Sequence, residues 1–211
     1  MLPEEPRSAG ATPLTPDVAG TPGAGADAAL AAACQGGSLP AFERLYHTHG
    51  AKMKSIAYNL LGNTTDAEDA VQETFLKVYR SIGGFKGQSS LATWVTRILI
   101  NNCYDLRRKR SRRQEVQELE NEEGQPLAEP AARGDERLRV VLRSCIAQLR
   151  ERERTVFTLF EVEGFSHAEI AGMLDISEAS SKNTLFLAKR ELRRMLLDAR
   201  GVGTSEGKAR P

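Results

Sequence analysis

The sequence predicts an all-α protein in which two helical modules are joined by a flexible linker. Apolar residues recur at the three- and four-residue spacing of amphipathic helices across residues 26–113 and again across 135–200. Residues 114–134 between them are acidic and contain two glycines and two prolines, a composition typical of a linker. No segment shows the strict alternation of a half-buried strand. Residues 1–25 and 201–211 lack an apolar period, so we expect them to be disordered tails.

Charge is unevenly distributed along a chain that is nearly neutral as a whole. The sequence carries 29 Lys and Arg against 28 Asp and Glu, a formal net charge of +1 at pH 7. Six cations fall within residues 107–113, whereas residues 115–123 are strongly acidic. The neutral total therefore hides a local surface that could bind a polyanion.

The cysteines and the hydropathy exclude several classes of protein. Cys34, Cys103 and Cys145 form no C-x-x-C pair and have no His at metal-ligand spacing. We therefore expect no disulfide framework, no metal site and no cofactor. No apolar stretch is long enough to span a membrane, and the acidic, Pro-rich beginning lacks a signal-peptide layout. These features predict a cytoplasmic protein without membrane insertion.

Four helices are predicted in the first module. They cover residues 27–35, residues 40–61, a segment that begins at Thr65 and a segment that begins near residue 91. Thr65 with Glu68 three residues later matches a capping box, which satisfies two backbone N–H groups at a helix start. The expected core of the second and third helices consists of Phe42, Leu45, Tyr46, Met53, Ile56, Ala57, Leu60, Ala67, Ala70, Val71, Phe75, Val78 and Ile82.

A second face of the third helix carries Asp69, Gln72, Glu73 and Leu76 at positions i, i+3, i+4 and i+7. A polar helical face of this kind is most often simply solvated. One apolar residue rimmed by acidic and amide groups is also suited to docking against a basic partner. The residues alone leave both interpretations open.

The fourth helix and the loop before it favour contact with nucleic acid. Residues 85–90 are predicted to form a loop, with Ser89 or Ser90 as the N-cap of the helix. The polar face of this helix leads into the basic run and consists of Thr93, Arg97, Asn101, Tyr104, Asp105 and Arg108. Bases stack on flat rings while cations neutralise phosphates, so the surface suits a single strand. The alternative is a solvated helix end whose cations complement the helix dipole.

The second module contains the layout of a helix-turn-helix. Ser166 and Glu169 match a capping box before a short helix, and Asp175 lies at a turn where left-handed backbone is expected. Ser177 then caps a longer helix over residues 178–197. Two amphipathic helices precede this layout, with expected inner residues Leu138, Val141, Leu142, Cys145, Ile146 and Leu149 in the first and Val156, Leu159 and Phe160 in the second, which covers 152–161.

In a helix-turn-helix, the start of the second helix enters the major groove of duplex DNA. The residues expected to face the bases are Glu178, Ala179, Lys182, Asn183 and Phe186, with Lys189, Arg190, Arg193 and Arg194 nearer the phosphates. The inward position of Ser181 is compatible with the fold if its hydroxyl bonds a carbonyl one turn earlier. A plain three- or four-helix bundle with a short connection is the alternative.

Two parts of the sequence resemble bacterial sigma factors. The resemblance to sigma region 2 rests on residues 66–80, 85–94, 97–98 and 101. The resemblance to region 4 rests on residues 164–177. Two such regions in this order, with a short linker, are specific to the extracytoplasmic-function group of the sigma-70 family, and the resemblance covers most of residues 37–198. Thr184 and Leu187 depart from the family pattern, because arginine is frequent at their positions.

The resemblance implies a role for each surface. The β′ clamp helices of core RNA polymerase would contact Asp69, Gln72, Glu73 and Leu76. The melted −10 element would be held by Phe85, Lys86, Gln88, Ser89, Ser90, Trp94, Arg97, Asn101, Asp105, Arg107 and Arg108. The −35 duplex would be read, beside the polymerase β flap, by Ser166, Glu178, Ala179, Lys182, Asn183, Phe186, Lys189 and Arg190. An anti-sigma factor, common in this group, is a further expected partner.

The resemblance thus implies a sigma factor that directs promoter recognition, melting and transcription initiation by binding, and not an enzyme. One rival is a conventional helix-turn-helix regulator that acts without replacing the housekeeping sigma factor. A second rival is a helical hydrolase or nuclease, although no Ser-His-Asp, Cys-His or paired-carboxylate set supports it. His47, His49 and His167 are expected on solvated surfaces or caps.

Overall fold

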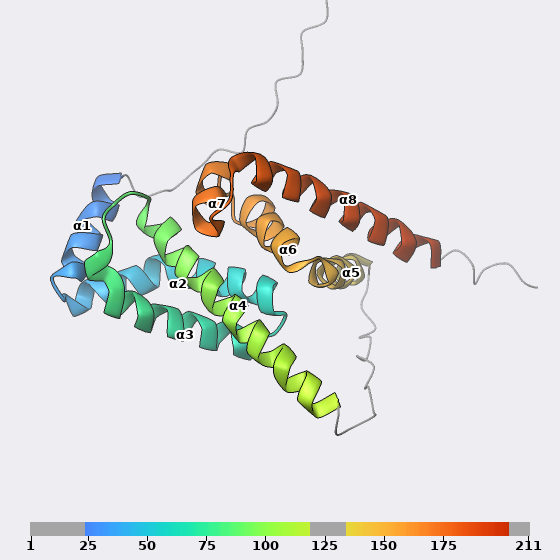
Figure 1. Ribbon diagram of the computed structural model, residues 1–211, viewed down its shortest axis with the longest axis horizontal. Coiled ribbons are helices and arrows are strands. Elements are labelled where there is room, and N and C mark those ends of the chain that lie inside the picture. The colour runs from blue at the N-terminus through green and yellow to red at the C-terminus, as the bar shows by residue number, and fades with distance from the viewer. Residues whose placement is uncertain (1–23, 119–133, 203–211) are drawn as a thin grey trace, which may run out of the picture.

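The computed structural model describes residues 24–118 and 134–202, and within these ranges every regular element is a helix or helical turn (Figure 1). The predicted all-α class with two modules is therefore confirmed. Most of the predicted linker (114–134) and of the predicted tails (1–25 and 201–211) lies outside the described residues. In the described part of the chain, no helix combines the length and the apolar character needed to cross a membrane.

The first module is a bundle of three long helices with a shorter helix at one end (Figure 1). α2 (Leu39–Leu61), α3 (Thr64–Ser81) and α4 (Leu91–Glu118) pack on one another, and α1 (Ala24–Gln35) lies beside the 3-10 turn η1 (Ile82–Gly84). The bundle forms because helical spacing brings a row of apolar side chains to one face of each helix. The fully buried side chains of this core include Leu45, Met53, Ile56, Leu60, Val71, Val78, Val95 and Leu99.

The start of α3 differs from the prediction, because Asn63 caps the helix and the expected capping box at Thr65 is wrong. The Asn63 Oδ1 accepts a hydrogen bond from the Asp66 backbone N–H at 2.7 Å, and its amide donates to the Asp66 carboxylate at 2.6 Å. Asn is as strong an N-cap residue as Ser or Thr. This reciprocal pair forms two residues earlier in the chain, immediately after Gly62 ends α2 in the left-handed conformation.

The structure differs from the predicted linker at both of its ends. The helix continues to Glu118, five residues into the segment predicted as linker. Gln, Glu and Val are compatible with a helix, and the first glycine after them is Gly124, so the acidic composition alone does not end it. The second module begins with α5 at Gly134, one residue before the predicted boundary.

The second module contains α5 (Gly134–Gln148), α6 (Glu151–Phe157), the π-helical turn η2 (Thr158–Val162), α7 (His167–Leu174) and α8 (Glu178–Val202). The helix predicted over 152–161 is therefore interrupted: η2 closes with a hydrogen bond from the backbone N–H of residue 163 to the carbonyl of residue 158 at 3.0 Å. Cys145 of α5 and Leu149, just after its end, are buried as expected, whereas the expected inner residues 138 and 142 are exposed.

The two modules share one apolar core. Val156, Leu159, Phe165 and Ile170 of the second module belong to the same contiguous buried cluster as the core of the first. α7 packs against α4, and α6 packs against α2 (Figure 1). A smaller cluster between α5 and α8 is formed by Cys145, Leu149, Ala188 and Leu192. The segment predicted as a flexible linker therefore connects modules that are in direct contact.

Candidate polymerase and nucleic-acid interface

The face of α3 predicted to contact polymerase is open to solvent. Asp69, Gln72 and Glu73 are exposed, and Leu76 is 51% exposed among them. The opposite side of the helix is anchored by Thr74, whose buried hydroxyl both donates and accepts a hydrogen bond within the core. The four side chains are therefore presented together on a fixed support, with one apolar residue among acidic and amide groups.

Two aromatic pairs join α2 and α3. The rings of Phe42 and Tyr79 are 4.8 Å apart, and those of Tyr46 and Phe75 are 4.9 Å apart. Tyr46 was expected in the core but is exposed, and Phe42 and Phe75 are only partly buried. Tyr79 was missed by the sequence reasoning, although its position three residues after Leu76 places it next to the predicted polymerase face.

The loop between η1 and α4 brings two aromatic rings together. Phe85 and Trp94 lie with ring centroids 5.3 Å apart and planes tilted by 52°. The loop turns at Gly87, whose φ of +69° favours glycine. Of the two predicted caps, Ser90 is the one used, because its Oγ accepts from the Thr93 backbone N–H at 3.0 Å. The other loop side chains predicted to read the −10 element are exposed, namely Lys86, Gln88 and Ser89.

This loop forms one wall of a cavity of about 740 Å³ that lies between the two modules. Trp94 and Arg97 of α4 line the cavity together with the loop. Glu169 and Met173 of α7 form part of the opposite wall. The structure thus brings together the residues predicted to hold an unpaired base. α7, the first helix of the helix-turn-helix, forms part of the wall opposite them.

The polar face of α4 is only partly exposed. Arg97, Asn101 and Asp105 face solvent as predicted. Thr93 and Tyr104, expected on the same face, are instead covered by the second module: their hydroxyls donate to Glu169 of α7 at 3.3 Å and to residue 155 of α6 at 2.8 Å. Burial raises the pKa of Tyr104. Helical periodicity could not reveal this cover, because it comes from a segment more than fifty residues away in sequence.

Several cations of the basic run in α4 are paired with carboxylates. Arg108 lies 2.7 Å from Asp105 on the same helix, and Arg110 lies 3.2 Å from Asp66 of α3. Arg107 is half-buried, with its Nε 3.7 Å from a Glu151 carboxylate oxygen of α6. Exposed pairs of this kind contribute little to stability, so their cations can exchange a carboxylate for a phosphate.

The helix-turn-helix forms through the local interactions that its sequence predicts. The Ser166 side chain accepts from the Glu169 N–H, and the Glu169 carboxylate accepts from the Ser166 N–H at 2.9 Å, which completes the capping box. Asp175 ends α7 in the left-handed conformation, with φ 54° and ψ 50°. The Ser177 hydroxyl accepts from the residue 180 N–H at 3.1 Å and caps α8. All three predictions are confirmed.

The outer face of α8 carries the side chains predicted to read the −35 element. All of these are exposed: Glu178, Ala179, Lys182, Asn183, Phe186, Lys189 and Arg190. Lys189 is paired with Glu161 of η2 at 2.6 Å. Thr184 occupies a position where the family often has arginine. Its side chain is buried, and its hydroxyl donates to the carbonyl of residue 180 at 2.8 Å. This difference from the family therefore lies on the inner side of α8.

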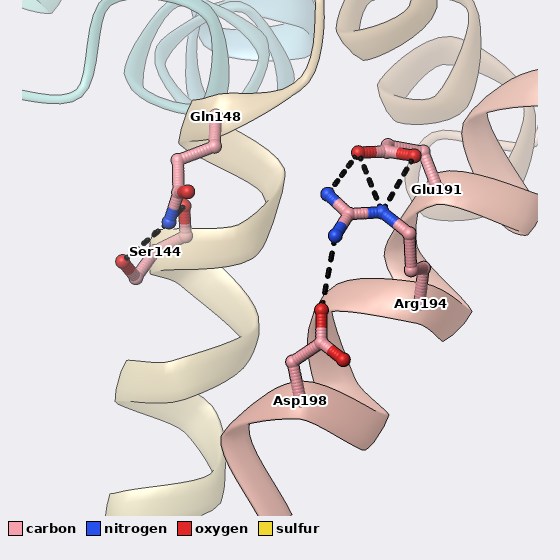
Figure 2. Close-up of polar contacts among 5 residues, drawn as sticks. All are labelled: Ser144, Gln148, Glu191, Arg194 and Asp198. Atoms are coloured by element: carbon pink, nitrogen blue, oxygen red, sulfur yellow. Dashed lines mark hydrogen bonds and ion pairs between the residues drawn. The ribbon is translucent and has the colours of Figure 1, made fainter. Parts of the chain in front are cut away.

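Further along α8, Arg194 is held within its own helix. Its guanidinium lies 2.6 Å from the Glu191 carboxylate and 2.9 Å from the Asp198 carboxylate (Figure 2). The hydrogen bond from Arg194 is the main cause of a lowered pKa of Glu191. Of the three arginines predicted near phosphates, Arg190 and Arg193 have no ion pair within the described residues, so both are more available cations than Arg194.

The buried Ser181 connects the two helices of the motif. Its hydroxyl hydrogen-bonds the His167 Nδ1 at 2.9 Å, rather than the expected carbonyl one turn earlier. The His167 ring stacks on Phe160 with centroids 4.3 Å apart. His49 is not solvated as expected: it is buried in α2, and its Nε2 has no hydrogen-bond partner among the described residues.

A second, more apolar groove lies between α5 and α8. It has a volume of about 480 Å³, and Lys189 and Arg193 lie along it. Its apolar lining consists of Leu138, Leu142, Phe157, Leu192, Leu196 and Leu197. The exposed leucines of α5, contrary to the core position expected for them, therefore line an open groove.

Comparison with known proteins matches both modules. A model of sigma-70 region 2 matches residues 45–113, and a model of sigma-70 region 4 matches residues 139–192. The ECF RNA polymerase sigma-E factor of Salmonella typhimurium is 31% identical over 176 residues, which cover 79% of this chain and 92% of that factor.

Two solved structures are similar in fold. CnrH, solved in complex with the cytosolic domain of CnrY, has a TM-score of 0.64 and 27% identity, covering 82% of this chain and 98% of that one. The sigma factor RpoE of Bartonella quintana, solved with the anti-sigma factor NepR, has a TM-score of 0.61 and 26% identity, covering 74% of this chain and 96% of that one.

Proposed function

The chain belongs to the extracytoplasmic-function group of RNA polymerase sigma factors, which recognise promoters, and we propose that the surfaces described above divide this function between its two modules. The observation that carries the proposal is the exposed stripe of Arg97, Asn101 and Asp105, which continues from the Phe85–Trp94 aromatic pair. Stacking rings followed by amides and cations fit an unpaired strand that leads into duplex.

The α3 face would contact the β′ clamp helices of core polymerase. Asp69 and Glu73 supply negative charge that suits a basic partner, and Leu76 supplies apolar area at the centre. Interfaces commonly place an apolar anchor inside a polar rim, which matches this arrangement.

The second module would read the −35 element with the outer face of α8. Lys182, Asn183 and Phe186 lie near its first turns, where a recognition helix meets base edges. The groove between α5 and α8 is a suitable site for the polymerase β flap, since it combines apolar leucines with Lys189 and Arg193.

Promoter melting then follows from differential binding rather than catalysis. A first module that binds the unpaired strand better than duplex shifts the equilibrium toward open DNA. Extruding a base costs a few kcal/mol, and stacking returns about 1–3 kcal/mol per base. Contacts with polymerase would supply the remainder. Because core polymerase and promoter DNA occur together in the bacterial cytoplasm, we propose this compartment as its place of action.

An anti-sigma factor is a further partner in this proposal. Both similar structures were solved with a bound protein, which for RpoE of Bartonella quintana is an anti-sigma factor. A regulator that covers the α3 face or the α5–α8 groove would compete directly with polymerase.

Reconstitution with core polymerase tests the proposal against a conventional helix-turn-helix regulator. The chain should bind core enzyme and start transcripts at defined promoter positions. Glu73→Lys should weaken core binding by roughly 100-fold, because like charges at an interface cost several kcal/mol. Glu43→Lys, an equal charge reversal at an exposed site on α2, serves as the control and should have little effect. A chain that binds operator DNA but not core enzyme would establish the rival instead.

A further inference from the structure

The side chain of Gln35, the last residue of α1, bonds both ends of the turn that begins the −10 loop. Its Nε2 lies 2.9 Å from the Phe85 carbonyl oxygen and 3.2 Å from the Ile82 carbonyl oxygen. A primary amide nitrogen carries two hydrogens, so one side chain can satisfy both acceptors. Gln35 thus connects the end of α1 to the start of the loop.

The turn is anchored in the core at Ile82, but its next two residues are glycines and carry no side chain that could fix their direction. η1 is a single 3-10 turn closed by one hydrogen bond, from the Phe85 N–H to the Ile82 carbonyl at 3.0 Å. Gly83 and Gly84 occupy its middle, and both have open space where a Cβ would lie. Glycines leave the backbone unusually free, so contacts from outside the turn determine how the chain leaves α3.

The helix end that carries the exposed Gln35 side chain is held firmly. Cys34 and Ala31, on the same helix, are almost completely buried. The chain then turns sharply, with Gly37 in the left-handed region at φ 77° and the Ser38 N–H bonded to the carbonyl of residue 33 at 3.1 Å. The amide that reaches the loop therefore extends from a fixed helix end.

We propose that Gln35 is a positioning residue for −10 recognition, which holds Phe85 beside Trp94 in the arrangement that receives an unpaired base. This inference rests on the proposed function of the loop. In the described part of the chain, the Gln35 side chain bonds only backbone carbonyls of the turn. It acts by removing alternative loop conformations before DNA arrives. Such preorganisation increases selectivity because the correct base meets a formed site and no ordering remains to be done.

The test uses holoenzyme assembled from core polymerase and the full chain. Gln35→Glu preserves size, but a carboxylate has no N–H to donate and would face two carbonyl oxygens. The measurement is the rate of open-complex formation, by permanganate reactivity, on a promoter and on copies with single −10 bases replaced. The preference for the cognate bases should fall by about tenfold, the equivalent of one net hydrogen bond.

Two further variants define the result. Gln148→Glu is the matched control, because the Gln148 amide donates to Ser144 within α5, in the module that does not contain the loop (Figure 2). It should retain the preference. Gln35→Lys restores N–H donors and should recover part of it. Should the Glu variant fail to fold, Gln35→Ala, which introduces no charge, replaces it in the same comparison.

The outcomes separate this inference from the proposed function. If the unaltered chain itself shows no −10 preference with core polymerase, the proposed function fails. If the unaltered chain shows the preference and Gln35→Glu or Gln35→Ala retains it, the inference is overturned. A loss of preference accompanied by an equal loss of core affinity or thermal stability would also overturn it, since that result indicates a general structural role.

Discussion

The Thr93 hydroxyl of α4 donates to the Glu169 carboxylate of α7 at 3.3 Å and so ties the two modules together. The same carboxylate accepts from the Ser166 N–H with its other oxygen, at 2.9 Å. One side chain therefore both caps the first helix of the helix-turn-helix and anchors it beside the −10 loop.

Further contacts between the modules lie around a turn that follows η2. The Lys52 ammonium donates to the Glu163 carbonyl at 2.8 Å and lies 4.1 Å from the centroid of the Phe165 ring. The Ser55 hydroxyl donates to the Glu163 carboxylate at 2.7 Å. With the shared apolar core, these contacts define a closed arrangement of the two modules.

The closed arrangement should be incompatible with promoter binding. The positions −10 and −35 place the centres of the two elements roughly 25 base pairs apart. At about 3.4 Å per base pair, this separation is about 85 Å of B-DNA. We predict that an oxidised Ser55→Cys/Glu163→Cys pair, which links the modules, blocks promoter-dependent transcription, and that a reductant restores it.

Variants with only one of the two substitutions, Ser55→Cys or Glu163→Cys, are the controls for this locked form, and they should transcribe normally with and without oxidant. Formation of the bond is checked by mobility on a non-reducing gel. Equal transcription from the reduced and the fully oxidised double variant would show that the modules need not separate.

The shared core should make the two modules unfold together. Leu159 is fully buried in the second module, and Trp94, the only tryptophan, reports on the first. Leu159→Ala should lower the free energy of unfolding by about 2–5 kcal/mol, because it leaves a cavity. We predict that the tryptophan-fluorescence transition in urea shifts by as much as the far-UV circular dichroism transition.

Leu197→Ala is the comparison for that experiment, because Leu197 is 61% exposed on α8. Its effect should be within about 0.5 kcal/mol. A Leu159→Ala protein whose tryptophan transition stays in place would instead show two independently stable modules.

Two arginines on α8 should differ in their contribution to DNA binding. Arg190 is exposed without an ion pair in the described part of the chain, whereas Arg194 is bound to Glu191 and Asp198 (Figure 2). Arg190→Ala should weaken binding to −35 duplex and reduce the slope of log affinity against log salt by about 1. Arg194→Ala should change the slope much less, and fluorescence anisotropy across a salt series would measure both; equal slopes for the two variants would contradict this assignment.

Stability should fall in mildly acidic solution because of His49. Burial, assisted by the charge of Lys52 and opposed by that of Asp27, lowers the pKa of His49. The unfolded chain therefore takes up a proton near the ordinary pKa of about 6.5 before the folded chain does. The histidine's contribution to stability is complete above that pH and is lost as the pH falls toward the lower folded pKa.

Urea midpoints measured at about pH 7.5 and about pH 5.5 test this prediction. His49→Gln removes the titrating group and should reduce the difference between the two midpoints. His47→Gln, at a neighbouring exposed site on α2, is the control and should leave that difference unchanged. An undiminished difference in the His49 variant would assign the pH dependence to other groups.

Local sequence signals predicted the local features of the site well. The Ser166–Glu169 capping box, the left-handed Asp175 and the Ser177 cap each depend on residues within a few positions of one another. The Asn63 cap shows the limit of such reasoning, because two adequate caps stood two residues apart and only the folded backbone distinguishes them.

The sequence by itself determined the all-α class, the two modules and the order of their surfaces, because helical periodicity and capping are short-range properties. Only the tertiary structure decided that Thr93 and Tyr104 are covered by the second module and that Gln35 reaches the −10 loop. Contacts between residues about 50 or more positions apart depend on how helices pack, and helix packing is set by shape and burial across the whole chain rather than by any local pattern.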